Sequence, residues 1–465
     1  MTTPRISVVL TTHNYGKFVT GAIRSVLDQS LQDFELLIVD DGSTDYTARL
    51  LNEYVSDDRV NLIQLDGVGL PKACNHAIAM AKGEYIIRLD ADDYFHEDIL
   101  LIESNALDQN PEIHLVYCDY FRVDVAGELI DYYRLMSQDE MKLLDRSPLA
   151  AGAMYRKWCF EQVGGYNEEI DFQEDYDFWL KFVSQFNVKH VSLPLYSYRK
   201  HQVSMSTNTN PRSQARRLVK QQMAKQRHPI YPSVVGLIPA STSFRRGEEH
   251  KLPLEPIAGT PLIEYAIGAL TGCEHIQTTY VSTNDAEIEK LALARGADSL
   301  GCRPKDSSQA MASVVHVVKD FLLRLSHNRI ELPELIVTLT PNYPLISTMY
   351  VEEAIDTLLL HDYESVISVI GDDARHWRPG AMGLTAVGDG HAMVRHDKDT
   401  VYEETGGIRV IRVRNLLGQE WLGHSIGYVE LSPSDAIAAD GDEALLVVLE
   451  RLLQARSQQT RSRES

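Results

Sequence analysis

Acidic side chains recur where predicted strands end. Asp40-Asp41-Gly-Ser-Thr-Asp45 follows the apolar run FELLIV, and Asp90-Ala-Asp92-Asp93 follows EYIIRL. Glu174-Asp175 lies within FQEDYDFWLKF, and His201 closes the segment SYRKH. Carboxylates at the carboxyl end of a strand stay next to solvent and ligand, and so avoid the cost of burying an unpaired charge. Two aspartates one residue apart offer hard oxygen ligands to Mg²⁺ or Mn²⁺. The pattern predicts a site for a nucleotide and a divalent cation.

Each of these segments also has a purely structural interpretation. DDGSTD could be a turn in which Ser43 or Thr44 caps the next helix, and DADD could be an acidic turn before a helix. His201 could be a surface histidine bonded to the backbone. Both interpretations stay open for each segment alone, whereas the order and spacing of all of them together favour the ligand site.

The elements that would position these residues follow a regular pattern. From Arg5 onward, short apolar runs such as ISVVLTT alternate with longer amphipathic runs such as KFVTGAIRSVLDQ. This alternation predicts an α/β fold, a mostly parallel sheet with helices on both faces, whose ligands sit at the carboxyl ends of the strands. A second alternation begins at SVVGLIPA and continues through ELIVTLT and SVISVI, which predicts a second α/β domain.

The composition narrows the class of protein. The 465 residues correspond to two or three domains. The net charge of −21 would repel the phosphates of nucleic acids, so binding of nucleic acid through bulk charge is excluded. The five cysteines are widely spaced and suggest a reducing compartment. The sequence contains no run of about 18 apolar residues, the length that a membrane-spanning helix needs. We expect a cytoplasmic protein.

We expect four segments along the chain. Residues 1–206 form the first domain, 207–232 a polar linker that ends in the turn signals His228-Pro229 and Tyr231-Pro232, and 233–453 the second domain. Residues 454–465, QARSQQTRSRES, show no apolar periodicity and are expected to form a disordered tail.

Over about residues 4 to 206 the sequence resembles family 2 glycosyltransferases of the GT-A fold. The resemblance rests on VVLTTHNYGKFVTGAIRSVLDQS, DDGSTD, KACNHAIAMAKGEYIIRLDADD, VGGYNEEIDFQEDYDFWLK and YSYRKHQVSMS. It implies a nucleotide-sugar donor, a glycan acceptor and a divalent cation, Mn²⁺ or Mg²⁺. Inverting transfer needs a cation opposite the departing nucleoside diphosphate and a carboxylate near the attacking hydroxyl.

The resemblance also implies roles for individual residues. Asp175 would be the catalytic base, although its neighbours Glu174 and Asp177 could exchange roles with it. Asp92 would bind the metal through the DxD motif, and His201 would reach the metal or the diphosphate. The residues implied to contact the donor are Thr11, Asn14, Asp40 or Asp41, and Asp90. The family's ARN segment reads Ala73-Cys74-Asn75 here, and Lys72 would substitute for its phosphate-facing arginine.

Over about residues 234 to 452 the chain resembles cytidylyltransferases that make CMP-activated acid sugars, which implies a nucleotidyltransferase-like fold. Arg245, Arg246 and Lys251 follow the first strand, in a loop suited to a triphosphate, although a solvated basic loop is the alternative. Several family residues are replaced. Ser241 stands at the arginine of IPAR, Leu252 follows Lys251 in place of asparagine, and the DID metal pair reads Ala438-Ala439-Asp440.

The sequence therefore predicts a glycosyltransferase of surface-polysaccharide biosynthesis fused to a cytidylyltransferase-like domain. Three interpretations of the second domain stay open. It could be a degenerate domain, it could make a CMP-activated acid sugar that the first domain uses, or it could be a non-catalytic dimerisation or interaction module. We expect a homo-oligomer formed through this domain, and peripheral membrane association could arise through the acceptor.

Overall fold

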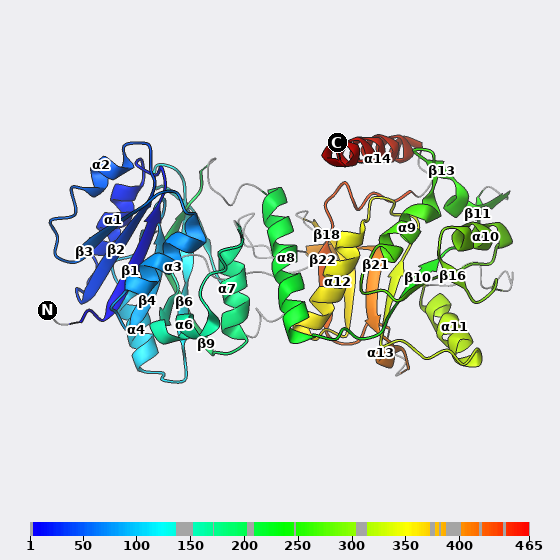
Figure 1. Cartoon of the computed structure of the whole chain (residues 1–465), viewed down its shortest axis with the longest axis horizontal. Coiled ribbons are helices and arrows are strands. Elements are labelled where there is room, and N and C mark those ends of the chain that lie inside the picture. The colour runs from blue at the N-terminus through cyan, green and yellow to red at the C-terminus, as the bar shows by residue number, and fades with distance from the viewer. Residues whose placement is uncertain are drawn as a thin grey trace. The chain divides into compact units, whose positions relative to one another are not determined.

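The structure is a computed structural model, and it describes residues 3–135, 152–170, 172–201, 209–245, 248–303, 314–372, 377–380, 383–386, 401–417, 421–439 and 443–464. The chain divides into two compact units, with the boundary between Val219 and Lys220 (Figure 1). Each unit is an α/β fold with a large sheet flanked by helices, as the sequence predicts.

The first sheet has nine strands in the order β3-β2-β1-β4-β8-β6-β9-β5, with β7 paired to β6. Strands β3, β2, β1 and β4 are parallel, whereas β8 pairs antiparallel with both β4 and β6. Parallel pairing thus runs without interruption through the half that carries the DDGSTD and DADD segments, and it recurs between β6 and β9 in the other half. The strands are β1 (Ile6–Thr12), β2 (Phe34–Asp41), β3 (Val60–Leu65), β4 (Tyr85–Asp90), β5 (Tyr94–Phe95), β6 (Leu115–Val123), β7 (Leu129–Tyr133), β8 (Met154–Arg156) and β9 (Val188–Arg199).

Helices cover both faces of this sheet because alternate strand residues point to opposite faces. Ile6, Val8 and Leu10 of β1 pack in one apolar cluster, while Val9 packs in another. The first cluster takes residues from α1 (Val19–Leu27), α2 (Thr47–Leu51) and α4 (Ile99–Asp108). The second takes residues from α3 (Leu70–Met80), α6 (Lys157–Val163) and α7 (Glu174–Val183). Both clusters are buried, so the sheet is held as a rigid platform for the loops at its carboxyl edge.

The second sheet has seven strands in the order β16-β15-β10-β17-β21-β18-β22. Strands β16, β15, β10 and β17 are parallel, and the long strand β21 runs antiparallel between β17 and β18. The strands are β10 (Val234–Pro239), β15 (Thr278–Ser282), β16 (Asp298–Ser299), β17 (Leu335–Leu339), β18 (Ser365–Asp372), β21 (Val401–Arg412) and β22 (Ile426–Glu430).

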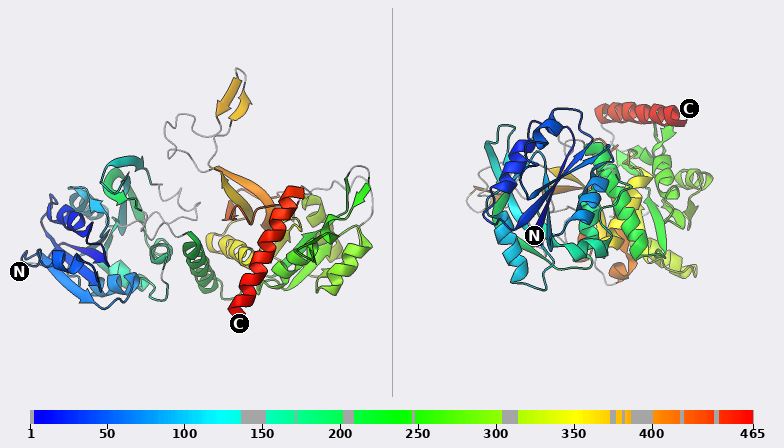
Figure 2. Two further views of the ribbon diagram at one scale, coloured as in Figure 1. Left: turned by 90° about the horizontal axis from the view of Figure 1, so that it is seen from above. Right: turned by 60° about the vertical axis from the view of Figure 1, so that its left-hand side comes forward.

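Helices and small hairpins complete the second unit. The helices are η2 (Leu252–Leu254), α9 (Leu262–Thr271), α10 (Ala286–Ala294), α11 (Val314–His327), α12 (Thr348–His361) and α13 (Val413–Leu417). Three two-stranded hairpins are β11 (Ser243–Arg245) with β12 (Glu248–His250), β13 (Pro256–Ile257) with β14 (Thr260–Pro261), and β19 (Trp377–Gly380) with β20 (Gly383–Ala386). The β19–β20 hairpin extends away from the sheet (Figure 2).

The expected linker is largely helical. Helix α8 (Thr209–Arg227) spans most of 207–232. Although α8 is polar overall, one of its faces is buried. The residues of this face recur at helical spacing and are Val219, Lys220, Met223 and Ala224. Lys220 Nζ lies 3.0 Å from Glu353 Oε1 on α12. The C-terminal part of α8 therefore belongs to the second unit.

The expected disordered tail is also helical. Helix α14 (Glu443–Glu464) continues through residues 454–464. Its apolar residues Leu449 and Leu453 are buried in a cluster with Ile257 and Leu345, so one face of the helix is anchored. Arg456 donates a hydrogen bond of 2.8 Å to the Leu345 carbonyl. The Gln, Ala and Arg residues that follow are good helix formers, which lets the helix propagate beyond its anchor.

Candidate active site

The first group of predicted residues meets at the carboxyl edge of the first sheet. In the strand register Thr11 lies opposite Asp90, and Thr12 lies opposite Asp40. Asp40 and Asp41 are both buried. Asp40 Oδ1 accepts a hydrogen bond from the Ser43 N–H. The parallel register therefore brings Thr11, Asp40 and Asp90 to one edge.

Asp41 holds the loop that follows β3. Its Oδ1 accepts the Val68 N–H at 2.7 Å, and its Oδ2 accepts the Gly69 N–H at 2.8 Å. Gly69 has φ 93°, a conformation that favours glycine, and it precedes the first turn of α3, where Lys72 is exposed. Each carboxylate oxygen of Asp41 has a second lone pair for a ligand N–H. Contact of Asp41 with the donor base stays a prediction.

Asn14 connects the first loop to the DDGSTD segment. It has φ 62°, and its Oδ1 accepts the N–H groups of Thr44 at 2.7 Å and Asp45 at 3.1 Å. Its own N–H donates to Ser43 Oγ. The side chain is exposed but its oxygen serves to fix this loop, so its contact with the nucleoside stays a prediction.

Asp92 and His201 come together although they are far apart in the sequence. His201 Nε2 lies 2.8 Å from Asp92 Oδ2, and both side chains are largely buried. The imidazole stacks on the Phe18 ring with centroids 5.1 Å apart. Burial, and then the nearby charge of Asp90, raises the pKa of the Asp92 carboxyl. The His201 imidazole therefore lies next to the negatively charged carboxylates of the DADD segment.

Asp93 of the DADD segment is held by two residues that sequence reasoning missed, Tyr196 and Arg199. Asp93 is buried and accepts hydrogen bonds from the Arg199 N–H at 2.7 Å and from the Tyr196 hydroxyl. Arg199 also donates from Nε to the Asp92 carbonyl at 2.8 Å. The available signal was the position of Arg199, which lies two residues before His201 on the same strand end.

Tyr15 is a further residue of the first loop that the sequence did not single out. Its ring lies edge-on to His201, with centroids 6.1 Å apart. Burial raises the pKa of the Tyr15 hydroxyl, and the charges of Asp92, Asp90 and Asp93 add to that effect. Tyr15 therefore stays protonated and can donate a hydrogen bond beside these carboxylates.

The three acidic residues at the start of α7 have different environments. Asp177 is buried and its Oδ2 lies 2.5 Å from Lys181 Nζ. Glu174 is buried and its Oε1 lies 3.3 Å from Arg88 Nη1. Asp175 is only partly buried. Of the three, Asp175 is therefore the one best placed to reach a ligand.

The donor atoms near Asp92 suit a cation that is shared with a ligand. Asp92 offers a carboxylate and His201 an imidazole, and the two groups lie next to each other. Mn²⁺ accepts both types of ligand. No group of three or more His, Cys, Asp or Glu among the described residues could hold a metal ion. This donor set fits Mn²⁺ or Mg²⁺ completed by diphosphate oxygens, the mode in which Mg²⁺ keeps few protein ligands.

Among the predicted nucleotide residues of the second unit, Lys251 is the one whose side chain the structure describes. Lys251 Nζ lies 2.9 Å from Asp285 Oδ2 and 2.8 Å from Glu287 Oε2. Arg245 lies in β11, while Arg246 and Asp440 lie outside the described residues. Lys251 is thus engaged by two carboxylates, and its contact with a triphosphate stays a prediction.

Ser241, at the position of the family's arginine, contacts a different arginine. Arg303 Nη2 lies 2.5 Å from Ser241 Oγ, and the Arg303 side chain is buried. The Arg303 N–H also donates to the Thr283 carbonyl at 2.7 Å. Arg303 therefore lies where β10 and β15 end, next to Ser241.

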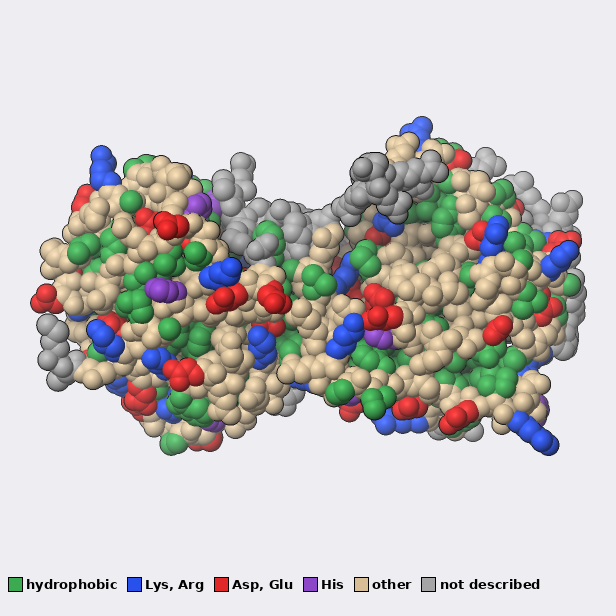
Figure 3. Space-filling model, in the orientation of Figure 1, with side chains coloured by type: hydrophobic (Ala, Val, Ile, Leu, Met, Phe, Trp, Pro, Cys, Tyr) green, Lys and Arg blue, Asp and Glu red, His purple; other side chains and the backbone are tan. Residues whose placement is uncertain are grey.

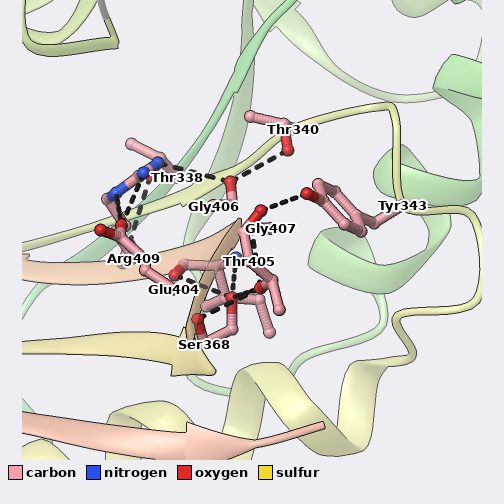
Figure 4. A network of polar contacts seen from close by, with 10 residues as sticks. Thr338, Thr340, Tyr343, Ser368, Glu404, Thr405, Gly406, Gly407 and Arg409 are labelled. Atoms are coloured by element: carbon pink, nitrogen blue, oxygen red, sulfur yellow. Dashed lines mark hydrogen bonds and ion pairs between the residues drawn. The ribbon is translucent and has the colours of Figure 1, made fainter. Parts of the chain in front are cut away.

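A bulge in β21 lies beside the carboxyl end of β17, where polar contacts form a network (Figure 4). The register of β21 against β18 shifts between Ile367 and Val369, opposite the ETGG segment. Tyr343 donates its hydroxyl to the Thr405 carbonyl, and Thr340 donates to the Gly406 carbonyl at 3.2 Å. Ser368 Oγ and Thr405 Oγ1 lie 2.7 Å apart. Side-chain donors at this edge are thus used within the protein.

Comparison with known families assigns both halves. The model of glycosyl transferase family 2 matches residues 7–147, and the cytidylyltransferase model matches residues 250–398. The chain joins a family 2 glycosyltransferase domain to a cytidylyltransferase-like domain. Both sequence resemblances are confirmed. The first match contains the DDGSTD and DADD segments, whereas Asp175 and His201 lie beyond its end.

Several relatives share the glycosyltransferase domain. Chondroitin synthase of Escherichia coli is 30% identical over 42% of this chain and 29% of its own length, and hyaluronan synthase of Pasteurella multocida is 29% identical over 42% of this chain and 20% of its own length. A crystal structure of S. aureus TarS in complex with UDP-GlcNAc shares 20% identity over 48% of this chain and 66% of that chain, with a TM-score of 0.43. The matches with the two synthases span less than a third of their length.

The surfaces of the two domains carry charges of both signs. On the face shown in Figure 3, acidic and basic side chains are interspersed. Within the part of the chain that the structure describes, no helix is long and apolar enough to cross a membrane.

Proposed function

We propose that the first domain is a metal-dependent glycosyltransferase that moves a sugar from a nucleotide-sugar donor to a glycan acceptor. The observation that carries this proposal is the convergence of Asp92 and His201, 109 residues apart, to 2.8 Å at the carboxyl edge of the sheet. Asp40, Asp41 and Asp90 line the same edge, where an open α/β sheet binds its ligands.

Different residues of this chain would remove the acceptor's proton and hold the cation during sugar transfer. The anomeric carbon of the donor loses its bond to the diphosphate and gains one to the acceptor oxygen, while Asp175 takes the acceptor's proton. Asp92 and His201 would hold the cation. When bound, Mn²⁺ or Mg²⁺ supplies positive charge opposite the negative charge that develops on the nucleoside diphosphate. The partial exposure of Asp175 supports the assignment of the base, because Glu174 and Asp177 are both buried.

The relatives support the class of acceptor. Two of them are named for the synthesis of chondroitin and hyaluronan. We infer a role in the biosynthesis of a surface polysaccharide, with the acceptor a growing glycan.

A donor screen tests this proposal. The full chain is incubated with Mn²⁺, a mixture of oligosaccharide acceptors and a panel of UDP-, GDP-, dTDP- and CMP-sugars, and release of the nucleoside diphosphate, or of CMP from the CMP-sugars, is measured. We expect release from at least one donor that increases with acceptor concentration. Release from none of them, by a folded chain, would contradict the proposal.

We infer further that the second domain has little cytidylyltransferase activity. Lys251 is held by Asp285 and Glu287, and Ser241 and Ala438 lack the charges of the residues they replace. The full chain with CTP, Mg²⁺ and candidate acid sugars should release little pyrophosphate. Rapid release would instead support the alternative of a bifunctional enzyme.

Association is the role that we propose for the second domain. Leu445 and Val448, three residues apart on one face of α14, are 36% and 43% exposed, and Val447 beside Val448 is 51% exposed. Sedimentation should show the full chain as a dimer or larger, whereas a monomer at micromolar concentration would contradict this role.

A further inference from the structure

A buried arginine connects the donor edge of the glycosyltransferase domain to the helix that carries Asp175. Arg88 lies in β4, two residues before Asp90, so both side chains point to the same face of the sheet. Arg88 Nε lies 3.3 Å from Asp90 Oδ1, and its Nη1 lies 3.3 Å from Glu174 Oε1. One guanidinium therefore contacts an acid at the strand end and an acid in the first turn of α7.

Packing holds this guanidinium in place. The side chains of Arg88 and Glu174 are only 10% and 8% exposed. The Arg88 guanidinium carbon lies 5.7 Å from the centre of the Tyr166 ring. A planar guanidinium with fixed donor directions orients its partners more closely than a lysine would.

The start of α7 is conformationally unusual. Gln173, the residue before the helix, has φ 64° and ψ 27°, in the left-handed region that non-glycine residues rarely adopt, and it is buried. Such a conformation persists only where surrounding contacts enforce it, and it recurs at functional sites. Glu174 is the residue after Gln173, and its buried contact with Arg88 is of the kind that enforces such a conformation.

Stability alone does not account for a buried ion pair. Removing two charges from water costs several kcal/mol, and apolar residues of similar size often serve the fold equally well. The pair does, however, fix the direction in which the first turn of α7 leaves the sheet. Asp175 is the next residue in that turn.

We propose that Arg88 and Glu174 form a positioning pair that sets Asp175 against the donor edge of the sheet. The inference rests on the proposed function, because it concerns the geometry of the same transfer. Neither residue touches the reacting atoms. Their contact places the base, and a misplacement of about 1 Å can lower a rate by about a hundredfold.

Because Glu174 can ionise, the pair should affect the pH dependence of the transfer rate. Burial, and then the charge of Asp175, raises the pKa of the Glu174 carboxyl to about 7. The other groups that face Glu174 and Arg88 from neighbouring elements are Asp90 on β4, Cys74 on α3, Tyr155 on β8 and Tyr166 before α7. When Glu174 is protonated, its attraction to Arg88 weakens. The transfer rate should therefore fall as the pH decreases through about 7.

Glu174→Gln tests the pair in the full chain. Glutamine keeps the size of the side chain, so the variant should fold, which thermal unfolding checks. We expect kcat to fall by about tenfold to a hundredfold with little change in donor KM, since base placement affects only the reacting geometry. The inflection near pH 7 should disappear, because the titrating group is absent.

Arg88→Met provides a second variant, and Arg122→Met is its matched control. Arg122 forms a comparably buried pair with Asp131, at side-chain exposures of 12% and 5%, in the β6–β7 hairpin. Arg88→Met should lower kcat as Glu174→Gln does, while Arg122→Met should keep the wild-type kcat and pH profile.

The outcomes separate this inference from the function on which it rests. If the wild-type chain transfers no sugar, the proposed function fails and the pair has no base to position. If the wild type transfers sugar and Glu174→Gln keeps the kcat and the inflection near pH 7, the inference alone is overturned.

Discussion

Asp92 Oδ2 and His201 Nε2 lie 2.8 Å apart because the end of β9 returns to the DADD segment. The register shows how this happens. Ser197 pairs with Tyr94 on β5, two residues after Asp92, and the chain then continues from β9 to His201. Arg199 secures the return by donating its N–H to Asp93. The meeting of a DxD aspartate and a late histidine is thus a consequence of sheet topology.

Asp175→Asn should lower turnover by a factor of about 10² to 10⁴, the usual contribution of a positioned general base. Asparagine cannot take the proton of the acceptor hydroxyl, whereas the residues implied to contact the donor are unchanged. Steady-state kinetics with a fixed acceptor and varied donor measure both effects.

Asp58→Asn is the control for this variant, since Asp58 is exposed and precedes β3 at its amino end. It should retain wild-type kinetics. Loss of donor affinity in Asp175→Asn with turnover intact would mean that Asp175 binds the donor and that another carboxylate is the base.

Glu103→Gln should stabilise the first domain at neutral and alkaline pH. Glu103 of α4 is fully buried beside the Cys118 thiol, and burial raises the pKa of its carboxyl well above the usual value. The folded protein therefore binds a proton that the unfolded chain releases, so stability falls as the pH increases above the unfolded pKa. The variant has no such proton. Its advantage should grow by up to about 1.4 kcal/mol per pH unit.

Urea unfolding at pH 5 and pH 8 measures this difference. The free energies of unfolding of wild type and variant should be similar at pH 5 and should separate at pH 8. A variant that is less stable than wild type at pH 8 would show that Glu103 is ionised and held by a partner in the folded protein.

The position of Lys220 predicts where the second domain can be cut. Lys220 Nζ contacts Glu353 Oε1 and Thr357 Oγ1, and Met223 and Ala224 are buried. A fragment from Ser233 to Ser465 leaves Glu353 without its cation, and breaking a buried pair costs about 3 to 5 kcal/mol. A fragment that begins at Thr209 keeps the pair.

Thermal unfolding of the two fragments tests this boundary. The fragment from Thr209 should unfold at a clearly higher temperature, and the shorter one could fail to fold. Equal unfolding temperatures would show that α8 adds nothing to the second domain and that a cut after Arg227 is harmless.

The sequence predicted those parts of the molecule in which local pattern and packing agree. The buried run EYIIRL and its neighbours became the parallel strands, and the acids that follow them came to one edge because parallel strands end together. The alternation of Val8, Val9 and Leu10 between two apolar clusters follows from the two-residue period of a strand.

Other features depend on contacts that no local pattern encodes. Helix α8 has a low overall hydrophobicity, and only its packing on α12 reveals the stripe that contains Met223. The ion pairs of Lys251 with Asp285 and Glu287 join segments more than 30 residues apart. In the sequence, Arg88 is noticeable as a charged residue inside an otherwise apolar strand. Its partner Glu174 could be identified only from the fold.

The most direct test of the account is the metal dependence of transfer in the Asp92→Asn variant. The full chain, Asp92→Asn, His201→Ala and the control Asp58→Asn are compared for nucleotide release with the active donor, in Mn²⁺ and in EDTA. We predict that wild type and Asp58→Asn need Mn²⁺ or Mg²⁺, that His201→Ala needs a higher metal concentration, and that folded Asp92→Asn loses most of its turnover. Full turnover of Asp92→Asn in EDTA would contradict the account.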